Sequence, residues 1–211
     1  MQSENVFNPN ETAGLSADYD ELQTAAVALL RAVKLIQIEL GETVLVSGNG
    51  PVGQAVAQLA RIAGAGRVIG LTDDGSVQTD DTQVVWMTDL GKVAEHLPQG
   101  QADLLIETSG NPAQLEKLLA CVRGGGRILL VGSIAGSANF DFYPHLHRRS
   151  LTLKSVTLQA ALAETGDDRL KDERESNFVS HLLRSGQLNM PDHLITNPMA
   201  GEPLLPVSSA S

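Results

Sequence analysis

Short runs of Val, Ile and Leu recur along the chain, and longer stretches with a helical pattern separate them. The runs predict strands at residues 43–47, 67–72, 83–87, 103–108, 127–132 and 151–156. Strands that alternate with helices in this way indicate an α/β fold with a doubly wound parallel sheet.

The predicted helices are bounded by capping residues, prolines and glycines. The first begins at Ser16 or Asp18, runs to about residue 40 and is stopped by Gly41. Further helices are expected at 51–63, at 90–97, from Asn111 to the glycines at 124–126, and at about 172–184. Residues 74–82 are polar, so we expect a loop there in place of the usual crossover helix.

Three glycines follow the first strand. Gly48, Gly50 and Gly53 form the G-x-G-x-x-G pattern between an apolar strand and an Ala-rich helix. In a dinucleotide-binding βαβ unit, the first glycine forms a tight turn, the second lets the backbone approach a pyrophosphate, and the third lets helix and strand pack closely. The N-terminus of the helix then binds the phosphate charge through its free N–H groups.

Several segments also carry a family resemblance. Residues 44–53 (VLVSGNGPVG), 103–110 (DLLIETSG), 124–133 (GGGRILLVGS) and 151–155 (LTLKS) follow one another in the order of a known domain. From about residue 25 to 196 the chain resembles the coenzyme-binding domain of medium-chain, zinc-type alcohol dehydrogenases. The resemblance implies a single Rossmann domain with strand order 3-2-1-4-5-6 and a nicotinamide dinucleotide as cofactor.

The resemblance also implies positions for the cofactor. Pro51 and Val52 would lie in the glycine turn at the pyrophosphate, and Thr72 and Asp73 would meet the adenosine ribose. The nicotinamide side would be lined by residues that follow the fourth and fifth strands, namely Thr108, Ser109, Val131, Gly132 and Ser133. No residue of this chain is expected to be catalytic.

The choice between NAD and NADP depends on the end of the second strand. The acidic residue that binds the ribose of NAD in the family aligns with Thr72, which would permit NADP. However, Asp73 and Asp74 follow, and no Lys or Arg occurs before Lys92. Since two carboxylates would repel a 2′-phosphate, the sequence favours NAD and leaves NADP open.

Zinc ligands are not expected in this chain. Family members carry a catalytic domain ahead of the coenzyme domain, whereas residues 1–24 contain neither Cys nor His. The family's last zinc ligand falls near Glu21, Leu22 and Gln23, and a catalytic zinc needs three N, S or O ligands. Three readings stay open: an oxidoreductase whose catalytic half is supplied by a separate chain, a non-catalytic cofactor-binding or interaction module, and a truncated remnant without activity.

Charge and composition exclude several other classes. The 211 residues carry a formal net charge of −10, which argues against nucleic acid or an anionic membrane as a partner. Neither a long apolar run nor a signal segment is evident, and a single cysteine fits a reducing compartment, so a cytoplasmic location is expected.

Other candidate residues favour structural roles. His145 and His147 before the sixth strand have no Cys or acid at ligand spacing, so a polar loop is favoured over a metal site. Cys121 is expected to be a buried small apolar residue. Glu107, inside the fourth strand, is a candidate buried acid, and a functional and a structural role both stay open for it.

The domain organisation and assembly complete the expectations. Residues 1–15 read as a loose tail, residues 16–196 as the Rossmann domain and residues 197–211 as a disordered tail. Segment 151–158 is β-prone with Lys154 as its only charge. Because the resemblance implies dimers paired through the sixth strands, we expect a homodimer through this segment.

Overall fold

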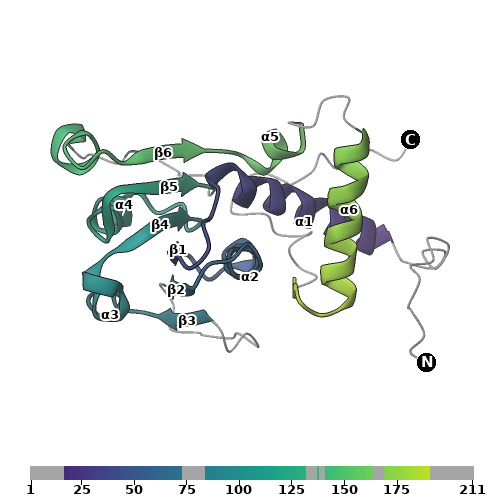
Figure 1. Cartoon of the computed structure of the whole chain (residues 1–211), viewed down its shortest axis with the longest axis horizontal. Coiled ribbons are helices and arrows are strands. Elements are labelled where there is room, and N and C mark those ends of the chain that lie inside the picture. The colour runs from purple at the N-terminus through teal and green to yellow at the C-terminus, as the bar shows by residue number, and fades with distance from the viewer. Residues whose placement is uncertain (1–16, 73–83, 132–136, 138–140, 164–168, 191–211) are drawn as a thin grey trace.

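A parallel sheet of six strands forms the centre of the molecule (Figure 1). The structure is a computed structural model, and it describes residues 17–72, 84–131, 137, 141–163 and 169–190. The strand order is β3-β2-β1-β4-β5-β6, and every neighbouring pair is parallel. The strands are β1 Thr43–Ser47, β2 Arg67–Leu71, β3 Val84–Met87, β4 Ala102–Glu107, β5 Val122–Leu130 and β6 Thr152–Ser155.

Helices cover both faces of this sheet (Figure 1). Alternate residues of each central strand point to opposite faces, so Val44 and Val46 of β1 belong to one apolar cluster and Leu45 to the other. One face packs against helices α1 Ala17–Ile36 and α2 Pro51–Ile62, and α5 Leu158–Ala163 and α6 Arg169–Arg184 pack on α1 and extend the same apolar cluster. The other packs against α3 Leu90–His96 and α4 Pro112–Ala120. The predicted doubly wound α/β fold and its strand order are therefore confirmed.

The glycines at 124–126 do not end a helix, and that expectation was wrong. Helix α4 already ends at Ala120, and the glycines lie inside β5. The pairing of β5 with β4 shifts register between Ala102 and Leu104, and Gly125 has φ +73°. A side chain at Gly126 would place its Cβ 2.5 Å from Cγ1 of Val122. The glycines therefore permit an irregular strand rather than a helix stop.

Other boundaries differ more modestly from those expected. Helix α1 ends at Ile36 instead of residue 40, where Gln37 adopts a positive φ of 57°. Helix α6 begins at Arg169, and the short α5 before it was not predicted. The expected loop at 74–82 and both predicted tails lie outside the described residues, so the proposed domain boundaries remain predictions.

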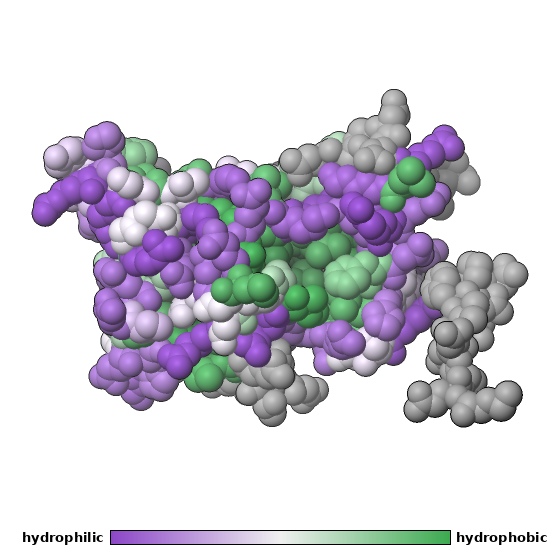
Figure 2. Space-filling model, in the orientation of Figure 1, coloured by the Kyte–Doolittle hydropathy of each residue, from purple (hydrophilic) through white to green (hydrophobic). Residues whose placement is uncertain are grey.

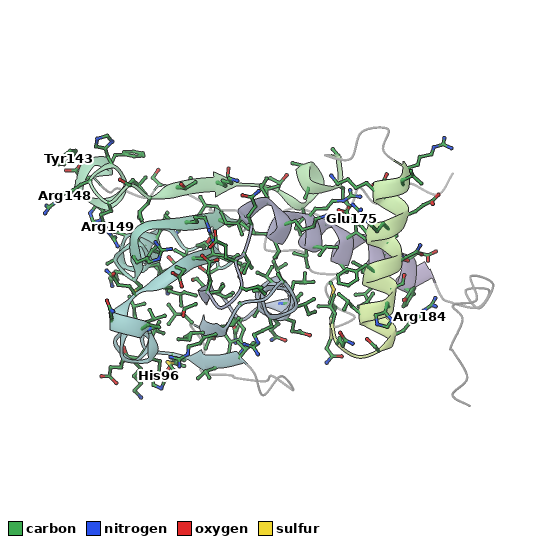
Figure 3. The ribbon with its side chains drawn as sticks, in the orientation of Figure 1. His96, Tyr143, Arg148, Arg149, Glu175 and Arg184 are labelled. Carbon is green, nitrogen blue, oxygen red and sulfur yellow. The ribbon has the colours of Figure 1, made fainter. Side chains whose placement is uncertain are left out.

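A buried ion cluster joins α1 to α6. Nε of Arg31 donates to Oε2 of Glu175 at 2.7 Å, and its Nη2 bonds Oδ1 of Asp172 at 2.5 Å. Nη1 of the same guanidinium donates to the Leu162 carbonyl oxygen at 2.9 Å, while Lys34 bonds the second oxygen of Glu175. Arg31 and Glu175 are 7% and 3% exposed, and Glu175 lies on the α6 side that meets α1 (Figure 3).

Glu175 makes this cluster sensitive to pH. Burial alone raises the pKa of its carboxyl, but hydrogen bonds and charge from Lys34 and Arg31 outweigh burial and hold this pKa below its ordinary value. A carboxyl with a lowered folded-state pKa stabilises the fold above its unfolded pKa, and this contribution is lost as the pH falls through the folded-state value.

We expect Glu175→Ala to lower the free energy of unfolding by about 3–5 kcal/mol near neutral pH, because it leaves Arg31 buried without its partner. Glu173→Ala, at an exposed position of the same helix, is the control and should cost at most about 0.5 kcal/mol. Urea unfolding at pH 7 and at about pH 3 measures both. Glu175→Gln removes the charge but keeps the shape of the side chain. The difference in unfolding free energy between the wild type and Glu175→Gln should shrink at the lower pH, and an unchanged difference contradicts the lowered pKa of Glu175.

Candidate functional site

The glycine turn after β1 is packed tightly against the loop after β4. Gly48 has φ +98°, a conformation that favours glycine, and its N–H donates to the Leu71 carbonyl oxygen at 2.8 Å. A Cβ at Gly48 would lie 2.8 Å from Oγ1 of Thr108 and 2.9 Å from the Ser109 nitrogen. The first glycine of the motif is therefore required by both conformation and packing.

Gly53 places helix α2 directly on this turn. A Cβ at Gly53 would lie 1.8 Å from the Gly48 carbonyl oxygen and 2.8 Å from Oγ1 of Thr108. Neither neighbour is the flexible end of a long side chain. Glycine is thus needed at this position for α2 to pack against the carboxyl ends of β1 and β4.

Gly50 is different, because no packing within the described chain requires a glycine there. It is the exposed N-cap of α2, with φ −60° and ψ 173°, values open to any residue. A Cβ added to Gly50 would meet no atom within 4 Å in the described part of the chain. The space in front of Gly50 is therefore open, as the approach of a ligand to this backbone requires.

The first turn of α2 has the properties of an anion site. Pro51 lies at its first position, and Val52 is buried beneath it. No acidic side chain stands in this turn, and Gly50 offers no side-chain cap. The free N–H groups and the positive end of the helix dipole thus face the open space beside Gly50.

The loop after β4 forms the neighbouring wall. Thr108 donates through its backbone N–H and its Oγ1 to the Ser47 carbonyl oxygen, at 2.9 and 2.6 Å. The hydroxyl oxygens of Ser47 and Ser109 lie 3.4 Å apart. The carboxyl ends of β1 and β4 are thereby joined, and Thr108 and Ser109 lie beside the glycine turn.

Glu107 holds this loop in shape. Its carboxylate is fully buried, and Oε1 accepts hydrogen bonds from the Ser109 N–H at 2.8 Å, the Ser109 hydroxyl at 2.5 Å and the Gly110 N–H at 3.1 Å. A structural role for this acid therefore has a geometric basis.

Ser47 was missed by sequence reasoning, although its place as the last residue of β1 was a usable signal.

Two other predicted site residues lie at the same edge of the sheet. Thr72 follows β2, is 1% exposed and donates through its N–H to the Met87 carbonyl oxygen at 2.8 Å. Val131 follows β5, is 6% exposed and donates to the Glu107 carbonyl oxygen at 3.0 Å. Asp73, Gly132 and Ser133 lie outside the described residues, and the cofactor contacts assigned to all five positions remain predictions.

Ion pairs gather at the opposite, amino-terminal edge of the sheet. Nε of Arg123 donates to Oδ1 of Asp103 at 2.6 Å, and Arg127 pairs with Glu42. Burial tends to raise the pKa of Asp103, but hydrogen bonds from Arg123 and the Thr43 N–H hold that pKa below its ordinary value. These charges stabilise the fold at the edge remote from the glycine turn.

The remaining candidate residues do not converge on a metal site. Nε2 of His145 lies 3.4 Å from Oε1 of Glu116, whereas the ring of His147 stacks near Tyr143 at 5.7 Å between centroids. Both histidines belong to a π-helix, Tyr143–His147, so the expected loop was wrong; this helix lies at an end of the molecule far from α6 (Figure 3). Among the described residues, no group of three or more His, Cys, Asp or Glu is arranged to hold a metal ion.

Cys121 behaves as an apolar residue. It caps the end of α4, is 7% exposed and lies in the cluster beneath that helix. Burial raises the pKa of its thiol, so the thiolate needed for reaction or metal binding is disfavoured. The expected role of a small buried residue is in keeping with this position.

The geometry of the sheet, turn and first helix defines a Rossmann-type nucleotide-binding fold. Residues 51–171 match the zinc-binding dehydrogenase family, and the chain belongs to this family. The earlier resemblance to zinc-type medium-chain dehydrogenases is thus confirmed. Within the described residues, no helix is long and apolar enough to cross a membrane.

Curated relatives are similar over part of their length. Over 127 residues the chain is 33% identical to L-threonine 3-dehydrogenase from Ruegeria pomeroyi. This aligned region covers 56% of this chain and 36% of that protein. Over 166 residues it is 28% identical to alcohol dehydrogenase 1 from Hordeum vulgare, covering 71% of this chain and 44% of the relative. The chain therefore spans less than half the length of these two relatives.

Solved structures share the fold. Alcohol dehydrogenase TADH from Thermus sp. ATN1 superposes with a TM-score of 0.62 at 21% identity, over 86% of this chain and 51% of that one. The quinone oxidoreductase from Thermus thermophilus, also solved in complex with NADPH, gives a TM-score of 0.62 at 23% identity. It covers 83% of this chain and 56% of that one.

The contrast between Gly53 and Gly50 can be tested by adding one methyl group to each. We expect Gly53→Ala to lower the free energy of unfolding by about 1–3 kcal/mol, because the Cβ overlaps the Gly48 carbonyl oxygen. Gly50→Ala, the matched control, should change stability by no more than about 0.5 kcal/mol. Urea unfolding monitored by circular dichroism measures both free energies of unfolding. Equal losses of stability in the two variants would contradict the described packing.

Proposed function

We propose that this chain binds a nicotinamide dinucleotide and serves as the coenzyme-binding part of a zinc-type alcohol or polyol dehydrogenase-like oxidoreductase. The observation that carries the proposal is Gly50, a glycine that no packing within the described residues requires and that leaves the N-terminus of α2 uncovered by them. Family membership supports the same function.

Each part of the dinucleotide has assigned residues in this proposal. Gly48, Gly50 and Gly53 hold the pyrophosphate, with Pro51 and Val52 in the same turn, because this backbone presents free N–H groups without a bulky side chain. Thr72 and Asp73 bind the adenosine ribose. The nicotinamide side is formed by the segments after β4 and β5, namely Thr108, Ser109, Val131, Gly132 and Ser133.

NAD is proposed as the preferred cofactor over NADP. Asp73 and Asp74 would place negative charge where NADP carries its additional phosphate, and no basic residue follows before Lys92. A solved structure of similar fold, the quinone oxidoreductase from Thermus thermophilus, is described in complex with NADPH. The two cofactors are therefore compared directly in the experiment below.

Catalysis requires a substrate-binding half that the described residues do not form. In the proposed enzyme, this half comes from a separate catalytic chain or from further sequence, and it supplies the zinc that polarises the alcohol. The alternative is a cofactor-binding or interaction module without turnover. Co-expression with the catalytic domain of a family member distinguishes them, because only the enzyme would gain alcohol-dependent NADH formation.

The direct test is fluorescence titration of the purified chain with NADH and NADPH. We expect saturable NADH binding, weaker NADPH binding, and at least about a tenfold loss of NADH affinity in Gly50→Val, because the branched side chain fills the space in front of the turn. The thermal midpoint of Gly50→Val should stay close to that of the wild type, since the added Cβ meets no described atom.

Gly124→Ala is the control for this titration. Gly124 lies at the amino-terminal end of β5, and its added Cβ would be 3.8 Å from the Arg149 carbonyl oxygen, an ordinary contact. This variant should bind NADH like the wild type. Absence of saturable binding to either nucleotide contradicts the proposed function, and tighter NADPH binding contradicts only the choice of NAD.

We also propose that two copies of the chain associate through segment 151–158. Strand β6 is an outer strand of the sheet, with Leu153 40% exposed. The Val156 N–H donates to the Leu130 carbonyl oxygen of β5. Successive backbone N–H groups of a strand point to opposite sides, so the Lys154 N–H also faces β5 and the Ser155 N–H faces the free edge. Pairing of two such edges about a twofold axis would satisfy these free backbone groups.

Sedimentation at micromolar concentration is expected to show a homodimer. Ser155→Pro removes one N–H donor on the free edge and should shift the protein toward monomer, because proline cannot take part in edge pairing at that position. Ser155→Ala keeps the donor and should remain dimeric. A monomeric wild type, or a dimer equally stable in both variants, contradicts pairing through β6.

A further inference from the structure

An apolar groove lies between α1, α2 and α6, away from the glycine turn. It has a volume of about 520 Å³. Its larger apolar lining residues are Leu30, Val33, Ile38, Leu59, Ile62 and Phe178. Figure 2 shows apolar side chains gathered in a hollow between α2 and α6 on the face turned to the viewer.

The groove has a buried floor and exposed apolar edges. Leu59 and Val33 are 1% and 2% exposed and belong to the core, whereas Ile62 and Phe178 are 36% and 42% exposed. An aromatic and an aliphatic side chain facing water across a cavity of this size mark a surface that gains from being covered. Pockets of a few hundred cubic ångströms suit several apolar side chains at once.

Positive charge stands at the edge of the groove. Lys34 and the exposed Arg174 line it together with Glu175. The Glu175 carboxylate is already bonded to both Arg31 and Lys34, so its charge is balanced within the fold. An occupant with an acidic residue next to its apolar segment would complement Arg174.

The described chain leads to this groove at its C-terminal end. Leu188 and Met190 are buried in the cluster that contains α1 and α2. Gln58 of α2 bonds Asn189 in both directions, with its Nε2 donating at 2.9 Å and its Oε1 accepting at 2.7 Å. Ile62 at the groove lies four residues, about one helical turn or 6 Å, beyond Gln58 on α2.

We propose that residues 203–207 (PLLPV) dock into this groove within the same molecule. The segment contributes three branched apolar side chains from Leu204, Leu205 and Val207, and Glu202 precedes it. Residues 191–211 contain two acids and no Lys or Arg, which matches the positive edge of the groove. Pro203 and Pro206 restrict the backbone to extended conformations, so less entropy is lost on docking.

The connecting residues 191–202 are long enough for this arrangement. A flexible linker of that length has a root-mean-square span of roughly 19 Å, well beyond one helical turn. Tethering gives the segment an effective concentration on the order of millimolar, so even a weak intrinsic affinity produces high occupancy.

The test is hydrogen–deuterium exchange and dye binding on the full chain. The double variant Leu204→Asp with Leu205→Asp should release the segment. If the segment is docked about nine-tenths of the time in the wild type, its release raises the undocked fraction about tenfold. Amide exchange should then become about tenfold faster in residues 29–38, 58–63 and 174–178. Binding of the apolar dye anilinonaphthalene sulfonate should rise in parallel. Ser208→Asp with Ser209→Asp adds the same charge next to the segment and should leave both readouts unchanged.

A synthetic peptide of residues 200–209 provides an independent readout. Added in excess to the Leu204/Leu205 double variant, it should restore slow exchange in the same helices and displace the dye. The proposal is overturned if exchange and dye binding are the same in the wild type and both double variants. It is equally overturned if protection in the wild type disappears on dilution, because the occupant is then a second copy of the chain.

Discussion

The contact of Gly53 with the carbonyl of Gly48 is the constraint on which the candidate site depends. Helix α2 can pack against the turn only because Gly53 carries no Cβ, and the loop after β4 can close on the turn only because Gly48 carries none. The close approach brings the first turn of α2, the end of β1 and the loop after β4 to one point. An anion-binding helix end is thereby presented at the carboxyl edge of the sheet, where ligands of open α/β folds bind.

The distribution of charge supports the same division of the molecule. The described ion pairs Asp103–Arg123 and Glu42–Arg127 lie at the amino-terminal edge, where they stabilise the strand starts. At the carboxyl edge the described interactions are hydrogen bonds of the backbone and of Glu107, which hold the loop of Ser109 in shape. A site that binds through oriented N–H groups needs such rigidity, because displaced dipoles lose most of their attraction for an anion.

Helix α6 is held by polar contacts as well as by apolar packing. Arg31 reaches from α1 to the carboxylates of Asp172 and Glu175 and to the carbonyl oxygen of Leu162. Removing one partner of a buried pair is costly, whereas the pair itself need not add much stability, so the network chiefly specifies how α6 crosses α1. That crossing leaves the apolar groove between α1, α2 and α6, a surface separate from the nucleotide site.

The sequence by itself determined the alternation of strands and helices and the glycine turn, because these depend on local patterns and on residue types with special backbone freedom. It placed β1 at residues 43–47, where the structure has it, and the start of α2 at Pro51. Only the tertiary structure decided the path of Gly124–Gly126 through β5, the end of α1 at Ile36 and the presence of α5. Two of these depend on partners distant in the chain: β4 for the glycine strand, and Arg31 for the carbonyl of Leu162 in α5. The same reason explains why Gly48, Gly50 and Gly53 look alike in sequence, while only the structure separates the two that packing requires from the one left free for a ligand.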